Sequence, residues 1–252
     1  MAITANAQRN HDQLFGDRVS TLSTTDPELI TYFDNFAFDE VFEQGSIDPH
    51  TRLLVILAAL IGCQAHTEYR IFLGAALSNG VTPVEAKEIV YHAIAYMGIG
   101  RVYDYLATTN QVLTDRGVEL PLPGQSTTTP ETRFEAGWKA QAGVLGDRLA
   151  QMHESATPDT KFIQNWLTAN CFGDHYTRTG LEFATRELLT WVIIVAQGGC
   201  DGQARGHVSG NVRVGNGRAV LLDALSQLVP YIGYPRTLNA LAAINEVAPA
   251  EA

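Results

Sequence analysis

Three residues in the C-terminal half of the chain could carry acid-base or thiol chemistry: Glu187, Cys200 and His207. Cys200 follows a Gly-Gly pair at a predicted helix start, where unpaired amide groups and the helix dipole favour an anion and lower a thiol pKa. If the helix is continuous, seven residues advance its face by about 700°, which leaves His207 within about 20° of Cys200 and two turns along. Glu187 lies near the start of the apolar segment ELLTWVIIVAQ, where a buried acid needs a partner.

Each of these residues also has an ordinary structural interpretation. A cysteine in an apolar stretch is usually a small core residue, which is the favoured interpretation of Cys63 and Cys171 and stays open for Cys200. His207 could hydrogen-bond a helix end, and Glu187 could complement a helix dipole from the first turn. The structural interpretation is also favoured for four further residues, as satisfied core histidines or core aromatics: His66, His92, Tyr96 and Tyr231.

An internal repeat sets the domain organisation. Adding 135 pairs seven identical residues, and an offset of 134 pairs three more upstream. The seven pairs run from Gly80 with Gly215 to Val112 with Val247, and Gly-Asp-Arg at 16–18 recurs at 146–148. Between the copies lies the Pro- and Thr-rich segment LPLPGQSTTTPE, typical of an extended connector. We therefore predict one module over residues 8–118, a linker over 119–133 and a second module over 134–250.

The hydrophobic pattern of both copies is helical. Thr82-Pro83 with Glu85 is a capping signal, apolar residues recur three to five apart up to Tyr96, and Gly98 occupies the position of a glycine cap. These signals predict a helix over 82–97. Glycines separate segments of three to four turns, so we expect about six helices in each module and an all-α fold of two tandem modules packed as a pseudo-dimer.

Composition excludes several classes of function. The 252 residues carry a formal net charge of −10 and no Lys/Arg cluster, which makes nucleic acid a poor partner. The longest apolar runs are about half a bilayer span, and the polar start lacks the core of a signal peptide, so we expect a cytoplasmic protein that does not insert in membranes. The three cysteines form no CxxC, and no ligand spacing suggests a metal or a cofactor.

The segment FLGAALSNGVTPVEAKEIVYHAIAYMGIGRVYDYL at 72–106 and its echo HVSGNVRVGNGRAVLLDALSQLVPYIGYPRTLNAL at 207–241 resemble the signature of the carboxymuconolactone decarboxylase family. The resemblance covers nearly all of both copies. It implies a compact helical bundle that oligomerises, with sites between modules. The family includes decarboxylases of aromatic degradation and thiol-dependent members of the AhpD-like peroxidase system.

The resemblance also implies a reactive set of a Glu, a Cys at the next helix start and a His seven residues later. In this sequence the set falls on Glu187, Cys200 and His207. The first copy has Leu53 in place of the Glu and Phe72 in place of the His. It keeps a His that the family often has in a later helix, His92, where the second copy has Gln227. We take Glu187, Cys200, His207 and His92 as the candidate catalytic residues.

Three functions are compatible with this set. The first is a cofactor-free lyase that decarboxylates a small carboxylated lactone or related unsaturated acid, with His207 as proton donor, Glu187 orienting it and Cys200 lining the pocket. The second is a peroxidase of peroxiredoxin type that uses Cys200 alone, because Gln203 replaces the second Cys of a CxxC pair. The third is a non-catalytic binding or assembly module. If single modules form a hexamer, the fused chain should form a homotrimer.

Overall fold

The computed structural model describes residues 2–250, and every regular element within that range is helical. The all-α prediction is confirmed. The first half contains α1 (Ala5–Phe15), α2 (Leu22–Thr25), α3 (Pro27–Asn35), the π-helix η1 (Phe36–Glu40), α4 (Pro49–Gly62), α5 (His66–Ser78), α6 (Pro83–Met97) and α7 (Ile99–Asp115). The second half contains α8 (Arg133–Leu145), α9 (Arg148–Ser155), α10 (Lys161–Trp166), the π-helix η2 (Leu167–Tyr176), α11 (Phe183–Gln197), α12 (Asp201–Arg213) and α13 (Arg218–Val247).

Local sequence signals set the bounds of α6. The Thr82 side chain accepts a hydrogen bond from the backbone N–H of Glu85, whose carboxylate in turn accepts from the backbone N–H of Thr82. This reciprocal capping satisfies two amide groups that the first helical turn would otherwise leave unpaired. Gly98 ends the helix with a φ of 73°, a conformation that glycine adopts without strain. The helix predicted over 82–97 is therefore present.

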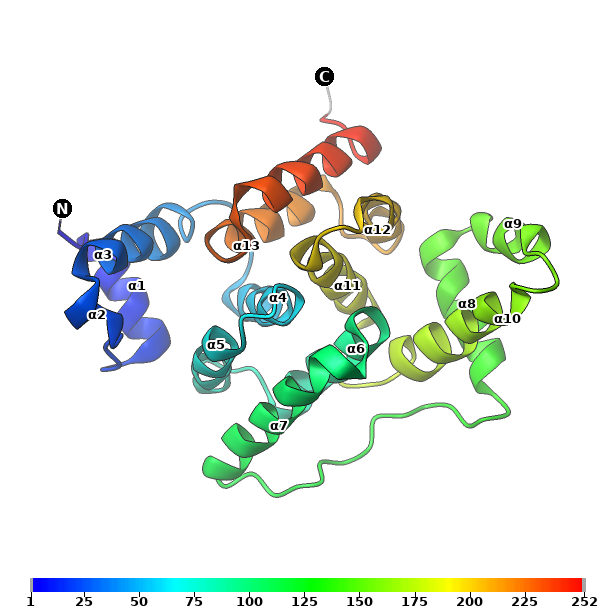
Figure 1. Cartoon of the computed structure of the whole chain (residues 1–252), viewed down its shortest axis with the longest axis horizontal. Helices are drawn as coiled ribbons and strands as arrows, with labels where there is room; N and C mark the ends of the chain where they lie inside the picture. Colours follow the sequence, from blue (N-terminus) through cyan, green and yellow to red (C-terminus); the bar gives the residue numbers. More distant parts are fainter. Residues whose placement is uncertain (1, 251–252) are drawn as a thin grey trace.

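The two halves repeat each other in three dimensions. The helices α4, α5, α6 and α7 correspond to α11, α12 and the two parts of α13. The break inside α13 lies at Gly233, whose φ of 74° matches that of Gly98 in the first half. A longer connector without helix, seen as a green trace in Figure 1, joins α7 to α8. The chain is thus a pseudo-dimer of tandem helical modules.

The two most apolar helices, α4 and α11, pack against each other at the centre. All residues from Arg52 to Gly62 and from Arg186 to Ala196 are buried. At Gly62 a Cβ atom would overlap Ile193 O and the Ala196 side chain, so glycine allows the helices to cross closely. Over the part of the chain that is described, no helix is both long enough and apolar enough to cross a membrane.

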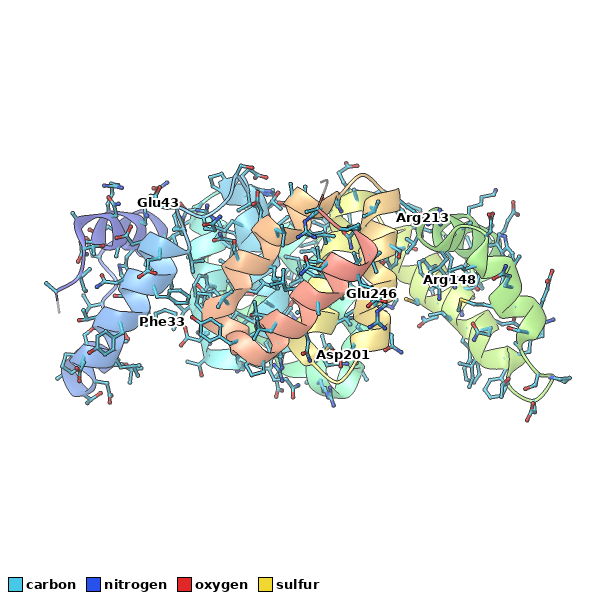
Figure 2. All side chains as sticks on the ribbon, turned by 90° about the horizontal axis from the view of Figure 1, so that it is seen from above. Phe33, Glu43, Arg148, Asp201, Arg213 and Glu246 are labelled. Atoms are coloured by element: carbon cyan, nitrogen blue, oxygen red, sulfur yellow. The ribbon has the colours of Figure 1, made fainter. Side chains whose placement is uncertain are left out.

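One helix of each module packs against the other module. The helix α6 packs on α11 and η2 of the second half, and α13 packs on α4 and η1 of the first. Figures 1 and 2 show α1–α3 at one end of the molecule and α8–α10 at the opposite end, with the remaining helices between them. Any cavity between a terminal group of helices and the centre is therefore bounded by both modules.

A buried ion cluster joins α6 to the second module. The Glu88 carboxylate, 1% exposed, accepts hydrogen bonds from Arg178 at 2.8 to 3.1 Å and from Arg186 at 2.9 Å. The Arg186 side chain is fully buried and also donates to the carbonyls of Arg178 and Thr179. Because both arginines belong to the second half, this cluster fixes α6 on the other module.

Candidate active site

A histidine and a buried glutamate form a direct hydrogen-bonded pair between α11 and α12. His207 Nδ1 lies 2.7 Å from Glu187 Oε1. The Glu187 side chain is fully buried, whereas His207 is 17% exposed. A carboxylate can only accept, so Nδ1 carries the proton and Nε2 is the ring nitrogen available to a ligand. This arrangement fixes both the tautomer and the orientation of the imidazole.

The other oxygen of Glu187 continues into a chain of hydroxyl groups. Tyr176 donates to Glu187 Oε2 at 2.5 Å and lies 2.7 Å from Thr190 Oγ1, which is 3.0 Å from the hydroxyl of Tyr96. Burial, followed by the nearby Glu187 carboxylate, raises the pKa of Tyr176 well above its ordinary value. Burial is also the main cause that raises the pKa of Tyr96. Both hydroxyls therefore stay protonated and can donate hydrogen bonds.

His92 approaches this network from the first module. Its Nε2 lies 3.1 Å from the carbonyl of Arg186 and 2.8 Å from Thr190 Oγ1. The carbonyl can only accept, so Nε2 is protonated, and the buried Nδ1 has no partner. Burial, together with the charge of Arg186, lowers the pKa of His92 well below its ordinary value. His92 is therefore neutral, and its contact with the hydroxyl network is made through Thr190.

The exposed side of this network opens into a cavity of about 420 Å³. Its walls are largely apolar, and its polar groups come from Tyr96, Gln141, Arg148, Cys171, Gln203 and His207. Arg148 is exposed at the start of α9 and is the single permanent cation among the lining residues. Ala95 and Tyr96 belong to α6, so the first module supplies part of the wall. A small acid could thus place a carboxylate at Arg148 and the rest of its skeleton in an apolar space.

Two residues of α12 hold the pair in place. At Gly210 a Cβ atom would overlap Glu187 Oε1 and Val144, so only glycine leaves room for the buried carboxylate. Asn211 donates to the carbonyls of Glu187 and His207 at 3.2 and 2.8 Å. At the Gly210 position the first module has Ala75, and at the Glu187 position it has Leu53. The two changes occur together: where leucine replaces the buried acid, the position equivalent to Gly210 carries a Cβ atom.

Cys200 lies away from this cavity. It precedes the first residue of α12 as predicted, but its Sγ accepts a hydrogen bond from Gln197 and lines a different cavity, next to Arg236 and Asn239. Seven helical residues correspond to about 10 Å along the axis, which separates Cys200 from His207 even on a shared face. The structure therefore brings together three of the four candidate residues, Glu187, His207 and His92.

A different cysteine adjoins the site. Cys171 of η2 lines the cavity, and its Sγ lies 3.7 Å from the hydroxyl of Tyr96. Burial raises the pKa of the Cys171 thiol to about 12. The group is therefore a neutral thiol at physiological pH and a poor nucleophile.

Several site residues could not be recognised from the sequence. Tyr176 and Cys171 have no distinguishing spacing, because η2 is separate from α11 and α12 along the chain, and Thr190 is one of many buried residues of α11. Arg148 carried a weak signal, since it belongs to the Gly-Asp-Arg motif that recurs in the first copy. Tyr96 carried a usable signal, since it recurs as Tyr231 in the repeat, but a core position explains that signal equally well. Among residues 2–250, no group of three His, Cys, Asp or Glu side chains is arranged to hold a metal ion.

The fold and the site together define a class of protein: tandem helical modules that enclose an acid-base pair in an apolar cavity between them. The chain belongs to the carboxymuconolactone decarboxylase family, whose sequence profile matches residues 27–111 and again residues 163–246. The family resemblance predicted from the sequence is confirmed, and so is its presence in two copies.

Two relatives and one solved structure extend this comparison. The chain is 29% identical over 100 residues to 4-carboxymuconolactone decarboxylase of Acinetobacter baylyi, a match that covers 40% of this chain and 75% of that protein. It is 32% identical over 88 residues to nitrosuccinic acid decarboxylase of Metarhizium robertsii, covering 35% of this chain and 59% of that protein. A Burkholderia xenovorans structure described as a gamma-carboxymuconolactone decarboxylase subunit covers 96% of both chains with a TM-score of 0.50 and 19% identity, which shows a shared fold.

The neutral state of His92 predicts a pH-dependent stability. An unfolded histidine binds a proton near pH 6.5, whereas folded His92 resists protonation, so the unfolded state binds more protons below that pH. Stability is thus complete above about pH 6.5 and falls as the pH is lowered, by up to about 1.4 kcal/mol per pH unit for one group. Glutamine stands at the equivalent position of the second module, Gln227, so His92→Gln is a conservative test. In this variant we expect the dependence of stability on pH to become less steep. Urea unfolding between pH 5 and 7.5 measures the free energy of unfolding at each pH. An unchanged pH dependence in His92→Gln would contradict the assignment of His92 as a buried neutral histidine.

Proposed function

We propose that this protein is a cofactor-free decarboxylase of a small carboxylated lactone or related unsaturated acid, with its site in the second module. The observation that carries the proposal is the Glu187–His207 pair at the wall of an apolar cavity with Arg148 at its edge. Two relatives named as decarboxylases support the same reaction type. Glu187 and His207 are the proposed acid-base pair, and His92 is proposed as a positioning residue.

Substrate binding would use the polar groups at the edge of the cavity. Arg148 can pair with one carboxylate of the substrate, and Gln203 can donate to a neighbouring oxygen. The carboxylate that leaves would then face apolar side chains such as Leu167 and Phe172. Desolvation favours the loss of a charged carboxylate as neutral carbon dioxide, so an apolar wall promotes cleavage of the carbon–carbon bond.

The cleavage step leaves an electron pair that needs stabilisation and then a proton. When carbon dioxide departs, the bonding pair moves into an adjacent carbonyl group and forms an enolate. The protonated hydroxyl of Tyr96 can donate a hydrogen bond to the enolate oxygen. His207 in its protonated form carries a proton on Nε2 and transfers it to the carbon, while the Glu187 carboxylate stabilises the imidazolium. Water then reprotonates His207.

The position of Cys200 favours decarboxylation over a thiol-dependent peroxidase. A peroxidase needs a base within hydrogen-bond reach of the reactive thiol. Cys200 has Gln197 as its partner and lines a cavity that excludes Glu187 and His207. The thiol that does adjoin the site, Cys171, stays protonated. The surroundings of these two cysteines therefore support decarboxylation over the alternative function.

Carbon dioxide release tests the proposal directly. Purified protein is offered 4-carboxymuconolactone and nitrosuccinate, and release is measured for the wild type and Cys200→Ser. We expect turnover of a small carboxylated acid and full activity of the Cys200→Ser variant, because the thiol lies outside the cavity. Loss of activity in that variant, or no turnover combined with rapid oxidation of Cys200 by peroxide, would overturn the proposal.

Arg148 should determine substrate affinity. In Arg148→Gln the charge is lost while a polar side chain of similar length remains, so we expect KM to rise by about 10-fold to 100-fold, with a smaller change in kcat. Steady-state kinetics measures both constants. The matched control is Arg205→Gln, since Arg205 pairs with Glu246 on the surface and lies outside the lining residues. Equal KM values for wild type and Arg148→Gln would remove Arg148 from the site.

The expected trimer stays a prediction, and one feature supports it. Exposed apolar pairs occur at equivalent places on α3 and α10, Leu29 with Tyr32 and Ile163 with Trp166. Repeated apolar patches of this kind suit repeated contacts between copies of the chain. Light scattering of the purified protein gives the mass, and a monomer would argue against the trimer.

A further inference from the structure

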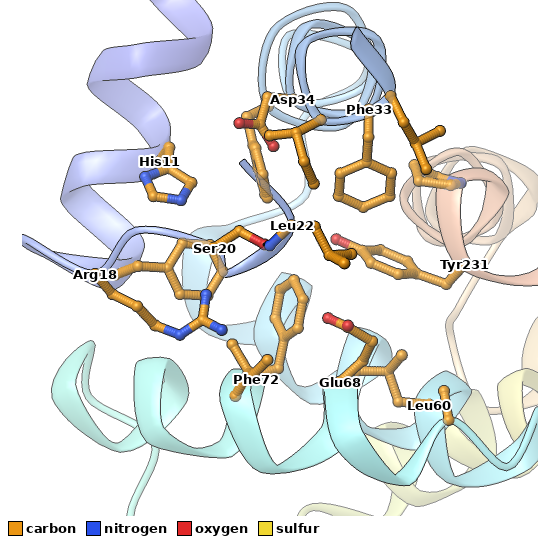
Figure 3. A pocket seen from close by; sticks show the side chains of 17 residues that line it. His11, Arg18, Ser20, Leu22, Phe33, Asp34, Leu60, Glu68, Phe72 and Tyr231 are labelled. Atoms are coloured by element: carbon orange, nitrogen blue, oxygen red, sulfur yellow. The ribbon is translucent and has the colours of Figure 1, made fainter. Parts of the chain in front are cut away.

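A second cavity, of about 300 Å³, lies in the first module at the place equivalent to the proposed active site. Figure 3 shows it between α1, α3, α5 and the first part of α13. Tyr231 lines it as Tyr96 lines the other cavity, and Arg18 occupies the place of Arg148. The equivalents of Glu187 and His207 are Leu53 and Phe72, so this cavity has no acid-base pair. The first module thus has a cavity that could hold a ligand, but it lacks the residues proposed for proton transfer.

Five aromatic side chains that line this cavity pack against one another in a closed circle. Each ring meets the next edge-to-face, with centroids 5.2 to 6.2 Å apart. In order around the cavity these residues are Phe15, Phe72, Tyr231, Phe33 and Phe38. The same five places in the second module hold Leu145, His207, Tyr96, Leu167 and Phe172. The first module thus has three phenylalanines at places where the second has two leucines and His207.

Two carboxylates face this aromatic cavity. Glu68 of α5 lies at its mouth and half-buried Asp34 of α3 lies in its wall. Neither side chain has a hydrogen-bond or ion-pair partner anywhere in residues 2–250, and the hydroxyl of Tyr231 has none there either. Figure 3 shows Asp34 on one side of the Tyr231 hydroxyl and Glu68 on the other. Burial raises the pKa of Tyr231, the charges of Glu68 and Asp34 add to this, and the charge of Arg52 acts in the opposite direction. These three polar groups line the cavity together with His11 and Arg18, and they make no hydrogen bond to one another.

We propose that the cavity of the first module binds an organic ammonium ion with an aromatic or aliphatic body. Aromatic faces attract cations through their quadrupole, and carboxylates at the cavity mouth add charge attraction. Glu68 and Asp34 would bind the ammonium group, and Tyr231 would accept a hydrogen bond from it. The five aromatic residues would enclose its apolar body. The inference concerns a binding site and does not depend on the proposed decarboxylase activity.

The cavity contains groups of both charges, so the charge of the ligand must be tested. Arg18 also lines the cavity, and Figure 3 shows it on the opposite side from Glu68 and the Tyr231 hydroxyl. If Arg18 determined recognition, the cavity would instead prefer a carboxylate. Three probes of matched size separate these cases: 2-phenylethylammonium, 2-phenylethanol and 3-phenylpropanoate. Isothermal titration of the full chain with each probe gives the affinities.

We expect 2-phenylethylammonium to bind at one site per chain, at least about 10-fold more tightly than the alcohol or the acid. Glu68→Gln and Asp34→Asn should each weaken ammonium binding by about 10-fold while leaving the alcohol unaffected. Glu40→Gln is the matched control, because Glu40 is an exposed acid of the same module outside the cavity lining. His207→Gln should bind the ammonium ion as the wild type does, which separates this site from the proposed active site.

Three results would overturn the proposal. The first is the absence of saturable ammonium binding at millimolar concentration. The second is tighter binding of 3-phenylpropanoate that is lost in Arg18→Gln. The third is ammonium binding that survives both Glu68→Gln and Asp34→Asn. Thermal unfolding of every variant verifies that its fold is intact before titration, because both acids are at least partly exposed and should be replaceable without loss of stability.

Discussion

His207→Gln is expected to lower kcat for decarboxylation by about 10²-fold to 10⁴-fold, the usual contribution of a positioned general acid. Glutamine can still donate a hydrogen bond to Glu187 Oε1, so the buried carboxylate keeps a partner and the fold should survive. It cannot deliver a proton from the position of Nε2. Carbon dioxide release under saturating substrate measures kcat, and circular dichroism checks the helical content.

Two further variants sharpen this prediction. His50→Gln removes a surface histidine paired with Glu85, and its activity should equal that of the wild type. Glu187→Gln removes the charge that would stabilise the imidazolium during proton transfer, so kcat should fall. A His207→Gln variant with wild-type kcat and intact helices would exclude His207 as the proton donor.

Glu88→Ala is expected to lower the free energy of unfolding by about 3–5 kcal/mol, since removing one partner of a buried ion cluster leaves an uncompensated charge. The fully buried Arg186 side chain would lose its carboxylate and keep only carbonyl partners. The cluster also joins α6 to the second module, so its loss should loosen the contact that places Tyr96 at the proposed active site. Activity should therefore decrease together with stability.

Chemical denaturation measures the first effect, and a surface pair provides the control. Glu246→Ala removes a partner of Arg205 where both side chains are more than half exposed, so it should cost no more than about 1 kcal/mol. Similar losses in Glu88→Ala and Glu246→Ala would show that the buried cluster contributes little. The double variant Glu88→Leu with Arg186→Met should recover much of the stability if the unpaired charge is the cause.

The exchange of helices explains why a duplicated chain can lose one site and keep the other. Each cavity is lined by several helices of one module and by one helix of the other module, α13 at the first cavity and α6 at the second. The first module therefore remains necessary to the proposed active site through Ala95, Tyr96 and His92, even though its own Glu and His positions hold Leu53 and Phe72. Its own cavity is then able to take a different ligand.

The sequence by itself determined the helical class, the duplication and the family. These features depend on local signals, such as the capping box at Thr82, the glycine at position 98 and the fixed offset between the copies. It also predicted Glu187 and His207 as site residues, because an acid in an apolar helix and a histidine on the next helix stand out against their neighbours. Such signals are encoded within a few helical turns.

Tertiary structure alone decided which groups meet. Cys200 directly precedes α12 and His207 lies within it, but the rise along the helix axis separates them, and Cys200 contacts Gln197 and lines a cavity with Arg236. Tyr176 and Arg148 reach the cavity from segments whose distance along the chain gives no hint of contact. The reason is physical: helical periodicity fixes which face a residue occupies, whereas the packing of α6 and η2 onto α11 determines what that face contacts.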